Sequence, residues 1–483
     1  MTSITSSKYK PWLDYRTVWR WHFYAGLFCI PFVCWLSITG AIYLFRPQVE
    51  AWLDKPYNHL TAAQAAAPSQ VVQAALASHP GWTLHAYQLP QTDYSAAQVL
   101  IGRQGEERRL YIDRGTLKVL KDVPEEGRFM RVMFHLHGEL LAGDRGSMIV
   151  ELAASWTIIM IITGLYLWWP RQTLGLAGVV YPRLNAGKRL FWRDLHAVTA
   201  VWVSLFAVVM IMSGLPWSKN WGGYLKDVRR LTGTASAHQD WTTGRSSEIA
   251  KNKAMDAAGM ASMPGMSDMA GAGTAHTGHA KRGGQWRRAG IALSAESLTA
   301  LDRAAPTVQA LNLAWPVLIS PPAESGGLWT GHSDAQNRPL RVDVKLDPTS
   351  GAVVSRTDFA QHTLIDRIVS VGVAAHEGQL FGWANQLLGV LIASSLLTVS
   401  TSAVVLWWRR RASGVLGAPI PDGNPRLSAG LLAIVIMLGV LLPLFGLSLT
   451  LVWLLERMVL KRIPLAAAWL GLRHTANAGS VMS

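Results

Sequence analysis

Charged residues are scarce in this chain. They make up 16% of its 483 residues, against 50% hydrophobic residues, whereas a soluble domain carries about 25% charged residues. The deficit is concentrated in long apolar runs, each close to the roughly 20 residues that a helix needs to cross the hydrocarbon core of a membrane. The composition excludes an ordinary soluble protein and predicts an α-helical integral membrane protein with spans at 22–45, 148–169, 196–217, 384–408 and 428–455.

Cysteine is almost absent, and this excludes several redox centres. Cys29 and Cys34 are the only two, and both lie in the first apolar run. Two cysteines are too few for an iron–sulfur cluster, and no CxxCH motif is present for covalent attachment of haem. The short connections between spans also lack a GxGxxG motif after a strand. A built-in nucleotide-binding or flavin-binding domain is therefore excluded.

Acidic residues are outnumbered, and the net charge is +15. The distribution of this charge argues against a nucleic-acid partner, because the positive-inside rule accounts for it. The basic residues cluster in the N-terminal segment and in the short connections, which we expect to be cytoplasmic: 1–21, 170–195 and 409–427. The long segments 46–147 and 218–383 are then expected on the far side of the membrane.

The charge pattern does not decide on which side of the membrane the tail 456–483 lies. A single crossing by 428–455 would place Arg457 and Lys461 on the far side, against the positive-inside tendency. A kink at Pro443 with an interfacial return of the chain is the alternative.

The chain contains an internal repeat of a helix, a loop domain and a helix, which points to a four-helix bundle followed by a fifth helix. When His22 is aligned with His196, Thr39-Gly40 falls on Ser213-Gly214. When His137 is aligned with His376, three further positions match: Gly143 with Gly382, Thr163 with Ser402, and Trp168-Trp169 with Trp407-Trp408. Repeats of this kind pack about a pseudo-symmetry axis, so equivalent residues tend to approach each other.

Each of the two loop domains has the pattern of a helix followed by an antiparallel sheet. The first has a helix at 69–78, and the second has a helix at 295–304. The strands are predicted at 83–89, 96–102 and 107–113 in the first domain, and at 308–319, 326–332 and 338–346 in the second. The segment 233–285 is rich in Gly, Ala, Ser and Met and has no apolar periodicity, so it is predicted to be a disordered insertion in the second domain.

Four histidines at the ends of the predicted spans are the strongest functional candidates. His22 and His196 begin the first and third spans, and His137 and His376 precede the second and fourth. The repeat pairs His22 with His196 and His137 with His376. Two facing imidazoles are the axial ligands of a b-type haem, so the pattern predicts two bis-histidine haems, one toward each face of the membrane.

A plainer interpretation is that these are interfacial histidines that hydrogen-bond to lipid headgroups. Their repeat-equivalent placement favours the haem interpretation. His135 lies two residues from His137 and is an alternative ligand, although the residue that matches it in the second repeat is Ala374. The histidines without a repeat partner are expected at the surface, including His85 and His332.

Two further features have both functional and plain interpretations. Glu151 lies inside the second span, where a carboxylate is costly. It either assists proton movement or ligand orientation, or, in the plain interpretation, its side chain simply reaches the membrane interface. Methionine and histidine are dense in the insertion, where thioethers and imidazoles suit soft Cu(I). The candidate copper ligands are Met260, Met263, Met266, Met269, His276 and His279, and the alternative is a plain flexible insertion.

Several stretches of the sequence resemble the PepSY-associated transmembrane family, which includes integral membrane siderophore reductases. They are WRWHFYAGL, LHGELLAGDRGSMIVEL with ITGLYLWWPR, WRDLHAVTAVW, and AHEGQLFG with VLWWRRR. The loop domains resemble PepSY domains at YIDRGTLKV and VDVKLDPTSGAVV. The resemblance covers nearly the whole chain outside the insertion 233–285.

The resemblance implies a multi-pass protein of the bacterial inner membrane with two periplasmic α+β PepSY-like domains. It implies two b-type haems on His22, His196, His137 and His376, and reduction of a ferric siderophore on the periplasmic side. A separate electron donor is expected, either a cytoplasmic reductase or membrane quinol. The Met/His insertion departs from the family and makes a cupric substrate an alternative.

A non-enzymatic alternative is also open. In it, the PepSY-like domains bind a peptide or a peptidase and the helices only anchor them in the lipid bilayer. The presence or absence of bound haem separates this regulator from the reductase.

Overall fold

The computed structural model describes most of the chain: residues 15–60, 65–170, 175–234, 295–322, 326–419 and 429–472. Most of the predicted insertion 233–285 therefore lies outside the described residues. The chain forms two compact units, each built from discontinuous segments. A helical unit contains Met1–Thr39, Ser147–Leu225 and Val390–Ser483, and a sheet unit contains Gly40–Gly146 and Lys226–Gly389.

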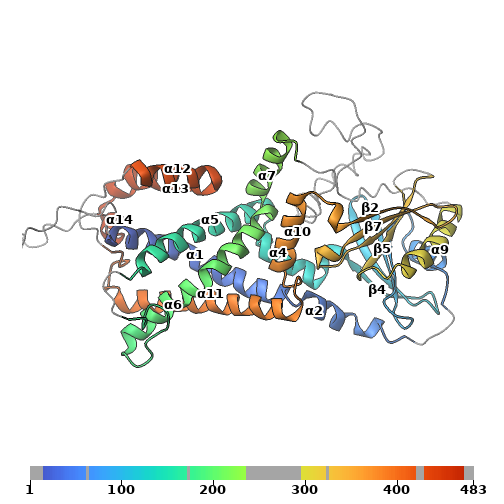
Figure 1. The fold of residues 1–483 in the computed structure, drawn as a ribbon, viewed down its shortest axis with the longest axis horizontal. Coiled ribbons are helices and arrows are strands. Elements are labelled where there is room, and N and C mark those ends of the chain that lie inside the picture. The colour runs from blue at the N-terminus through green and yellow to red at the C-terminus, as the bar shows by residue number, and fades with distance from the viewer. Residues whose placement is uncertain are drawn as a thin grey trace, which may run out of the picture. The chain divides into compact units, whose positions relative to one another are not determined.

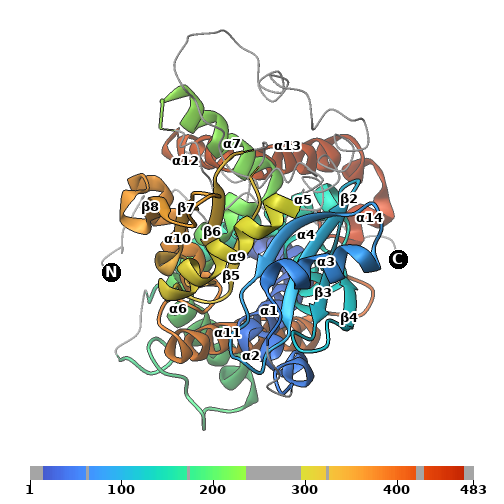
Figure 2. The same ribbon diagram turned by 90° about the vertical axis from the view of Figure 1, so that its right-hand side faces the viewer.

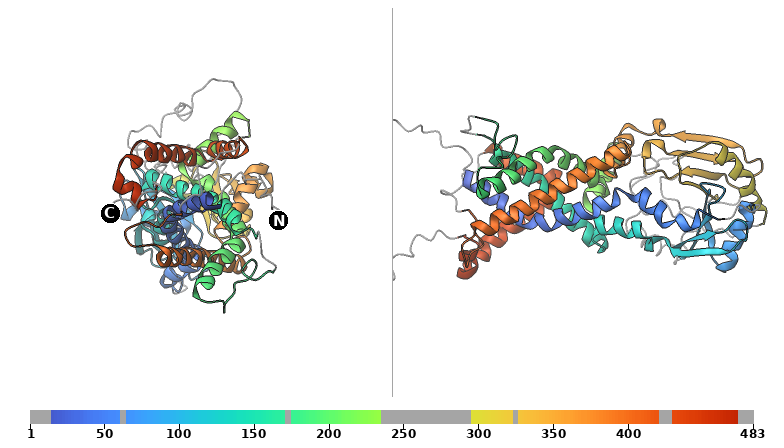
Figure 3. Two further views of the ribbon diagram at one scale, coloured as in Figure 1. Left: turned by 90° about the vertical axis from the view of Figure 1, so that its left-hand side faces the viewer. Right: turned by 90° about the horizontal axis from the view of Figure 1, so that it is seen from below.

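Four long apolar helices correspond to the first four predicted spans (Figure 3). They are α1 (Tyr15–Tyr43), α5 (Gly143–Trp168), α6 (Lys188–Gly214) and α11 (Trp383–Arg410). Together with Pro443–Arg462, they are long and apolar enough to cross a membrane, as expected of a multi-pass membrane protein.

The predicted starts of the first and third spans were too late. His22 lies seven residues after the start of α1, and His196 lies eight residues after the start of α6, so neither residue begins its helix. Hydropathy falls before each histidine because the preceding turns contain Arg and Trp. These residues have good or adequate helix propensity, and the backbone hydrogen bonds continue through them.

The fifth predicted span, 428–455, is not a single helix. It is divided into α12 (Ala429–Leu441) and α13 (Pro443–Met458), and Leu442 between them has φ −126° and ψ 80°. Pro443 has no N–H to continue the hydrogen bonds of α12. The chain turns so sharply that a Cβ built on Gly446 would lie 3.0 Å from the Cα of Gly439. The two helices form a hairpin (Figure 1).

The tip of this hairpin packs against α5 and the residues after α6. Trp156 on α5 donates its Nε1–H to the Ser448 hydroxyl at 3.0 Å and lies edge-on to Phe445. Trp221 donates its Nε1–H to the carbonyl of Leu441 at 3.1 Å. These contacts place the turn of the hairpin at the end of α6 that carries Gly214, far from Lys188.

The two ends of the hairpin lie together at the other end of the helical unit. Arg20, near the start of α1, donates to the carbonyl of Pro419 before the hairpin and to that of Gly471 after it, at 3.1 and 2.9 Å. The helix α14 (Pro464–Trp469) follows η9 (Leu460–Arg462), and the Trp469 carbonyl accepts a hydrogen bond from the Leu416 N–H. The hairpin therefore enters and leaves the helical unit at the end that carries Arg20.

We expect the C-terminus to lie on the same side of the membrane as the N-terminus. An odd number of crossings by 429–458 would separate the two, and would leave Arg457 and Lys461 on the side opposite to the other basic segments. Reporter fusions at residue 472 and within the segment before α1 check this, with a fusion at Gly105, in the first predicted loop domain, as the opposite-side control. Different reporter signals at the two ends of the chain would contradict the hairpin.

The sheet unit contains one continuous antiparallel sheet of eight strands in the order β4-β3-β2-β1-β5-β6-β7-β8. Strands β1 to β4 come from the first predicted loop domain: β1 (Thr83–Gln88), β2 (Ala97–Arg103), β3 (Glu106–Ile112) and β4 (Val119–Pro124). Strands β5 to β8 come from the second: β5 (Val317–Ser320), β6 (Trp329–Ser333), β7 (Val342–Leu346) and β8 (Val353–Asp358). The two halves join where Tyr87 pairs with Ile319 and Gln88 with Leu318.

The predicted helix-then-sheet pattern holds in both halves, with two differences. Each half has four strands rather than three, because β4 and β8 were not predicted. These are the two edge strands, and their residues are largely exposed, so they lack the alternation that identifies a half-buried strand. The predicted strand 308–319 also begins too early, since α9 (Ala295–Ala310) continues through its start.

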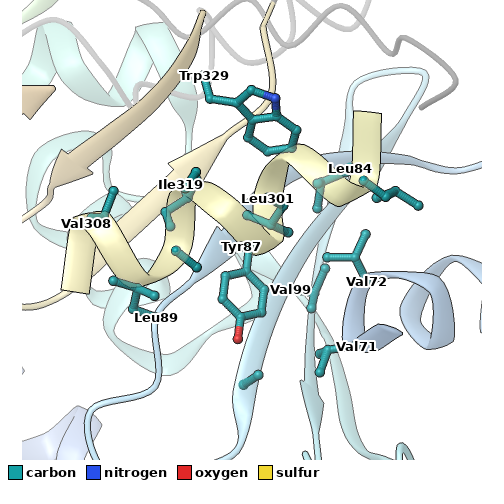
Figure 4. Close-up of a cluster of buried hydrophobic side chains, with 14 of the residues drawn as sticks. Val71, Val72, Leu84, Tyr87, Leu89, Val99, Leu301, Val308, Ile319 and Trp329 are labelled. Carbon is teal, nitrogen blue, oxygen red and sulfur yellow. The ribbon is translucent and has the colours of Figure 1, made fainter. Parts of the chain in front are cut away.

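One face of the sheet packs against α3 (Pro68–Ser78) and α9, which lie across it (Figure 2). Figure 4 shows the core between them, with Val72 of α3, Leu301 of α9, Tyr87 of β1 and Trp329 of β6 turned toward one another. Each of these side chains is at most 2% exposed. Both halves therefore share a single hydrophobic core, and they do not form two separate domains.

The remaining helices are short. They are α2 (Arg46–Leu53), η1 (Lys55–Tyr57), η2 (Glu125–Gly127), α4 (Phe129–Glu139), η3 (Leu215–Trp217), α7 (Lys219–Leu231), η7 (Arg338–Leu340), η8 (Phe359–Gln361) and α10 (Leu364–His376). Two of them, α4 and α10, carry His137 and His376.

Candidate metal centres

His22 and His196 lie together inside the helical unit. Their ring centroids are 6.4 Å apart and the ring planes are 81° to each other. An imidazole nitrogen binds a first-row metal at about 2.0 to 2.1 Å, so two rings on opposite sides of one metal ion have centroids roughly 6 Å apart. The separation suits one metal ion held between the two rings.

Each ring of this pair has a hydrogen-bond partner on its Nδ1. The Nδ1 of His22 is 3.0 Å from the hydroxyl of Thr163 on α5. The Nδ1 of His196 is 3.0 Å from the carbonyl of Val399 on α11, and Ser402 lies near it at 3.4 Å. The orientation of each ring is therefore fixed by the second long helix of its own repeat, which is α5 for His22 and α11 for His196.

His137 and His376 form an equivalent pair in the sheet unit. Their ring centroids are 6.2 Å apart and the planes are at 75°. His137 lies near the end of α4, and His376 is the last residue of α10. A Cβ built on Gly40 would lie 3.0 Å from the Cε1 of His137, so the α1 backbone approaches this ring as closely as a glycine allows.

The chain turns in the same way after both of these histidines. Gly143 begins the turn into α5 with φ 56°, and Gly382 precedes α11 with φ 60°. Each glycine lies six residues after its histidine, as the repeat alignment predicts. A residue with a Cβ is disfavoured at such a φ, which explains why both positions are glycine.

His135 is engaged elsewhere, and His137 is the residue that faces His376. The two ring nitrogens of His135 lie 2.6 Å from Glu126 and 3.0 Å from Glu139. Burial lowers the pKa of His135, but the hydrogen bonds to the two carboxylates outweigh it, so the pKa is raised. A ring held by two carboxylates has no nitrogen left for a metal, which removes the ambiguity that the sequence left open.

A buried network of charges holds α4 in place. Arg109 on β3 donates to Glu125 at 2.7 and 3.0 Å, and Arg128 at the start of α4 donates to Glu125 at 3.0 Å and to Glu50 at 3.2 Å. Burial raises the pKa of Glu125, but the two guanidinium groups overcome this and hold the pKa well below its usual range. The network ties α4, and with it His137, to the sheet.

A buried ion pair holds α10 in place. Arg229 on α7 donates to Asp366 on α10 at 2.8 Å, and the two side chains are 2% and 5% exposed. The hydroxyl of Thr363 donates to the same carboxylate at 2.7 Å, and it caps the start of α10. The pair fixes the first turn of the helix that ends at His376.

The other predicted site residues have different outcomes. The candidate copper ligands Met260, Met263, Met266, Met269, His276 and His279 lie outside the described residues. His85 and His332 are buried and not at the surface, since they are 9% and 5% exposed. His85 bonds to Glu107 on β3, beyond the intervening strand β2, and His332 bonds to Asp343 on the adjacent strand β7. Within the described residues, no group of three or more His, Cys, Asp or Glu side chains could hold a further metal ion.

Glu151 has a structural role in this molecule. The residue is 2% exposed, and its carboxylate accepts hydrogen bonds from the backbone N–H groups of Asn220 and Trp221, at 2.9 and 3.2 Å. These are unpaired donors of the first turn of α7, where a negative charge is favoured by the helix dipole. Glu151 therefore satisfies the start of α7 and is not directed toward either histidine pair by any bond described.

Three positioning features were not predicted from the sequence. Thr163 and Ser402 were aligned by the repeat but had no assigned role, and the ion pair of Arg229 with Asp366 has no local pattern. The spacing of 26 residues from His137 to Thr163 and from His376 to Ser402 was the available indication that these hydroxyls share a function.

Comparison with known proteins identifies a family for this chain. The family model of the PepSY-associated TM region matches residues 19–410. This range contains all four paired histidines and both halves of the sheet, and it ends before the hairpin. No curated protein matches the chain.

Proposed function

Because the chain belongs to the PepSY-associated transmembrane family, we propose that it is a di-haem b oxidoreductase that passes electrons across a membrane to a ferric chelate. The proposal rests on two separate pairs of facing histidines. Two imidazoles lie 6.4 Å apart in the helical unit and two others lie 6.2 Å apart in the sheet unit. His22 lies near one end of α1, and Gly40, which meets His137, lies three residues before its other end.

The residues fit a haem in each place. Axial ligation needs two neutral imidazoles on opposite sides of an iron atom and no covalent anchor. When bound, each haem would supply a one-electron couple and no proton chemistry. The protein would contribute the two axial nitrogens, the fixed ring orientations and an apolar environment that excludes water.

The direction of transfer follows from charge. The end of the helical unit that carries Arg20 is basic, and the positive-inside rule makes it cytoplasmic. Electrons would enter at the His22–His196 haem from a separate donor, either a cytoplasmic reductase or membrane quinol. They would leave from the His137–His376 haem on the periplasmic side of a bacterial inner membrane.

A ferric siderophore is the proposed substrate. Siderophores hold Fe(III) through hard oxygen ligands, and these bind Fe(II) less strongly because of its lower charge. Reduction would therefore release the iron with no need for a general acid or base. The Met/His insertion supports a cupric chelate as the second candidate, because thioethers and imidazoles suit Cu(I).

A visible spectrum of the purified full-length protein tests the proposal. We expect sharp low-spin bands after dithionite reduction, and reoxidation of the haems when a ferric siderophore is added. Cupric chelate, added in parallel, separates the two substrates by rate. A colourless preparation from haem-replete cells would leave the non-enzymatic regulator as the better account.

A further inference from the structure

Arg410, the last residue of α11, lies against the turn of α1 that carries His22. Its guanidinium carbon lies 4.5 Å from the centre of the Trp19 ring and 5.6 Å from the centre of the Phe23 ring. These two aromatic residues lie three positions before His22 and one position after it on α1. Arg410 therefore brings a cation from α11 to the turn of α1 beside the His22–His196 pair.

The guanidinium of Arg410 has hydrogen-bond donors to offer to a ligand. It carries five N–H groups, and one of its nitrogens donates to the carbonyl of Gly417 at 3.0 Å. Contact with the two aromatic rings occupies the face of the guanidinium and leaves the donors in its plane available. Among the described residues, no carboxylate pairs with Arg410, which is exposed. Such an edge suits an oxyanion, which arginine binds through two parallel hydrogen bonds.

Three other arginines at this end of the helical unit are already engaged. Arg20 donates to two backbone carbonyls, at 3.1 and 2.9 Å. Arg183 and Arg193 both pair with the carboxylate of Asp194, at 2.7 and 2.6 Å. Arg410 differs from these three because its guanidinium bridges two long helices without an acidic partner among the described residues.

A haem between His22 and His196 would bring an oxyanion to this end of the helical unit. A b-type haem has two propionate carboxylates at one edge of its ring. Carboxylates are costly in hydrocarbon, so this edge should point to the nearer face of the membrane and meet a cation there. His22 and His196 both lie near the starts of their helices, so the nearer face is at the end that carries Arg20. Arg410 lies at the same end.

We propose that Arg410 binds a propionate carboxylate of the haem held by His22 and His196. The proposal rests on the haem ligation proposed above. The guanidinium neutralises the carboxylate and so helps to retain the haem. It also raises the midpoint potential, because a positive charge near the iron opposes the additional positive charge of Fe(III). The phosphate of a lipid headgroup offers the same oxyanion chemistry, and the experiment separates it from the propionate.

The experiment compares haem with haem dimethyl ester, which lacks the propionate charges, in the full-length wild type and three variants. The variants are Arg410→Gln, Arg410→Lys and Arg411→Gln. Arg411 is the matched control, because its guanidinium also lies over two aromatic rings. These rings belong to its own helix, Trp407 at 5.2 Å and Trp408 at 4.3 Å. The readouts are the rate of haem loss to a competing apoprotein and the midpoint potential of each haem.

Arg410→Gln should lose one haem roughly 10- to 100-fold faster than the wild type, as expected when a hydrogen bond to a charged group is removed. The midpoint potential of that haem should fall, whereas Arg410→Lys should keep it near the wild-type value because the charge remains. The wild type should lose the dimethyl ester faster than haem, and Arg410→Gln should lose the two at the same rate. Arg411→Gln should behave as the wild type does.

Four results would overturn the proposal. Normal retention and potential in Arg410→Gln, with one haem lost in His22→Ala, would make a lipid phosphate the partner of Arg410 and leave the proposed function standing. An equal preference for haem over its ester in the wild type and in Arg410→Gln would place the propionates elsewhere. Equal effects of Arg410→Gln and Arg411→Gln would show a general effect of surface charge. A wild-type protein without haem would remove the proposed function and this inference with it.

Discussion

Replacing His22 with alanine should remove one haem and leave the other, and replacing His196 should remove the same one. The two rings lie 6.4 Å apart in the helical unit, so we expect either substitution to leave the iron with a single protein ligand. A b-type haem has no covalent anchor, and loss of one axial imidazole leaves little to retain it. The expected result is roughly half of the wild-type haem content, read from the pyridine haemochrome spectrum.

The complementary substitutions sharpen the test. His137→Ala and His376→Ala should remove the other haem, because these rings form the second pair at 6.2 Å. Each double variant within a pair should match its single variants, whereas His22→Ala combined with His137→Ala should abolish bound haem. His79→Ala in the sheet unit is a control, because that ring bonds to Asp122 and to the hydroxyl of Ser78. Depletion of the same haem by His22→Ala and His137→Ala would refute the pairing.

The histidine pairs could be predicted because the repeat gives long-range information. Equivalent residues of repeated units approach each other across a pseudo-symmetry axis, so matched spacing predicts contacts that single-sequence patterns do not. The alignment also matched Gly143 with Gly382 and Thr163 with Ser402, and the structure shows why. The two glycines adopt positive φ. The two hydroxyls lie beside ring nitrogens of His22 and His196.

Other features could not be predicted, for different physical reasons. The joining of β1 to β5 is a pairing of two strand edges far apart in the sequence, and hydrophobic alternation does not identify the partner of an edge. The hairpin of α12 and α13 is apolar on all sides, so its hydropathy resembles that of one long span. Only Pro443 and the basic residues after it indicated a return of the chain. His85 and His332 were wrongly expected at the surface, because their carboxylate partners come from other strands of the sheet and cannot be identified from the local sequence.

Replacing Arg229 with methionine should destabilise the sheet unit by about 3 to 5 kcal/mol, which is the usual effect of leaving one partner of a buried ion pair uncompensated. Asp366 is buried beside Arg229. Without the guanidinium, its carboxylate would either keep an unpaired charge or take up a proton, and both outcomes cost free energy of folding. Thermal unfolding in detergent, followed by tryptophan fluorescence, measures the loss. Asp366→Leu should produce a loss of similar size, because it leaves the Arg229 guanidinium buried.

The double variant separates the charge effect from packing. Replacement of a whole buried pair by apolar residues of similar volume is often close to neutral, so Arg229→Met with Asp366→Leu should be more stable than either single variant. The pair joins α7 to the first turn of α10, and His376 is the last residue of α10. The single variants should therefore release the His137–His376 haem at a lower temperature than the His22–His196 haem. If both haems were released together, or if the double variant were as unstable as the singles, the ion pair would not be what positions His376.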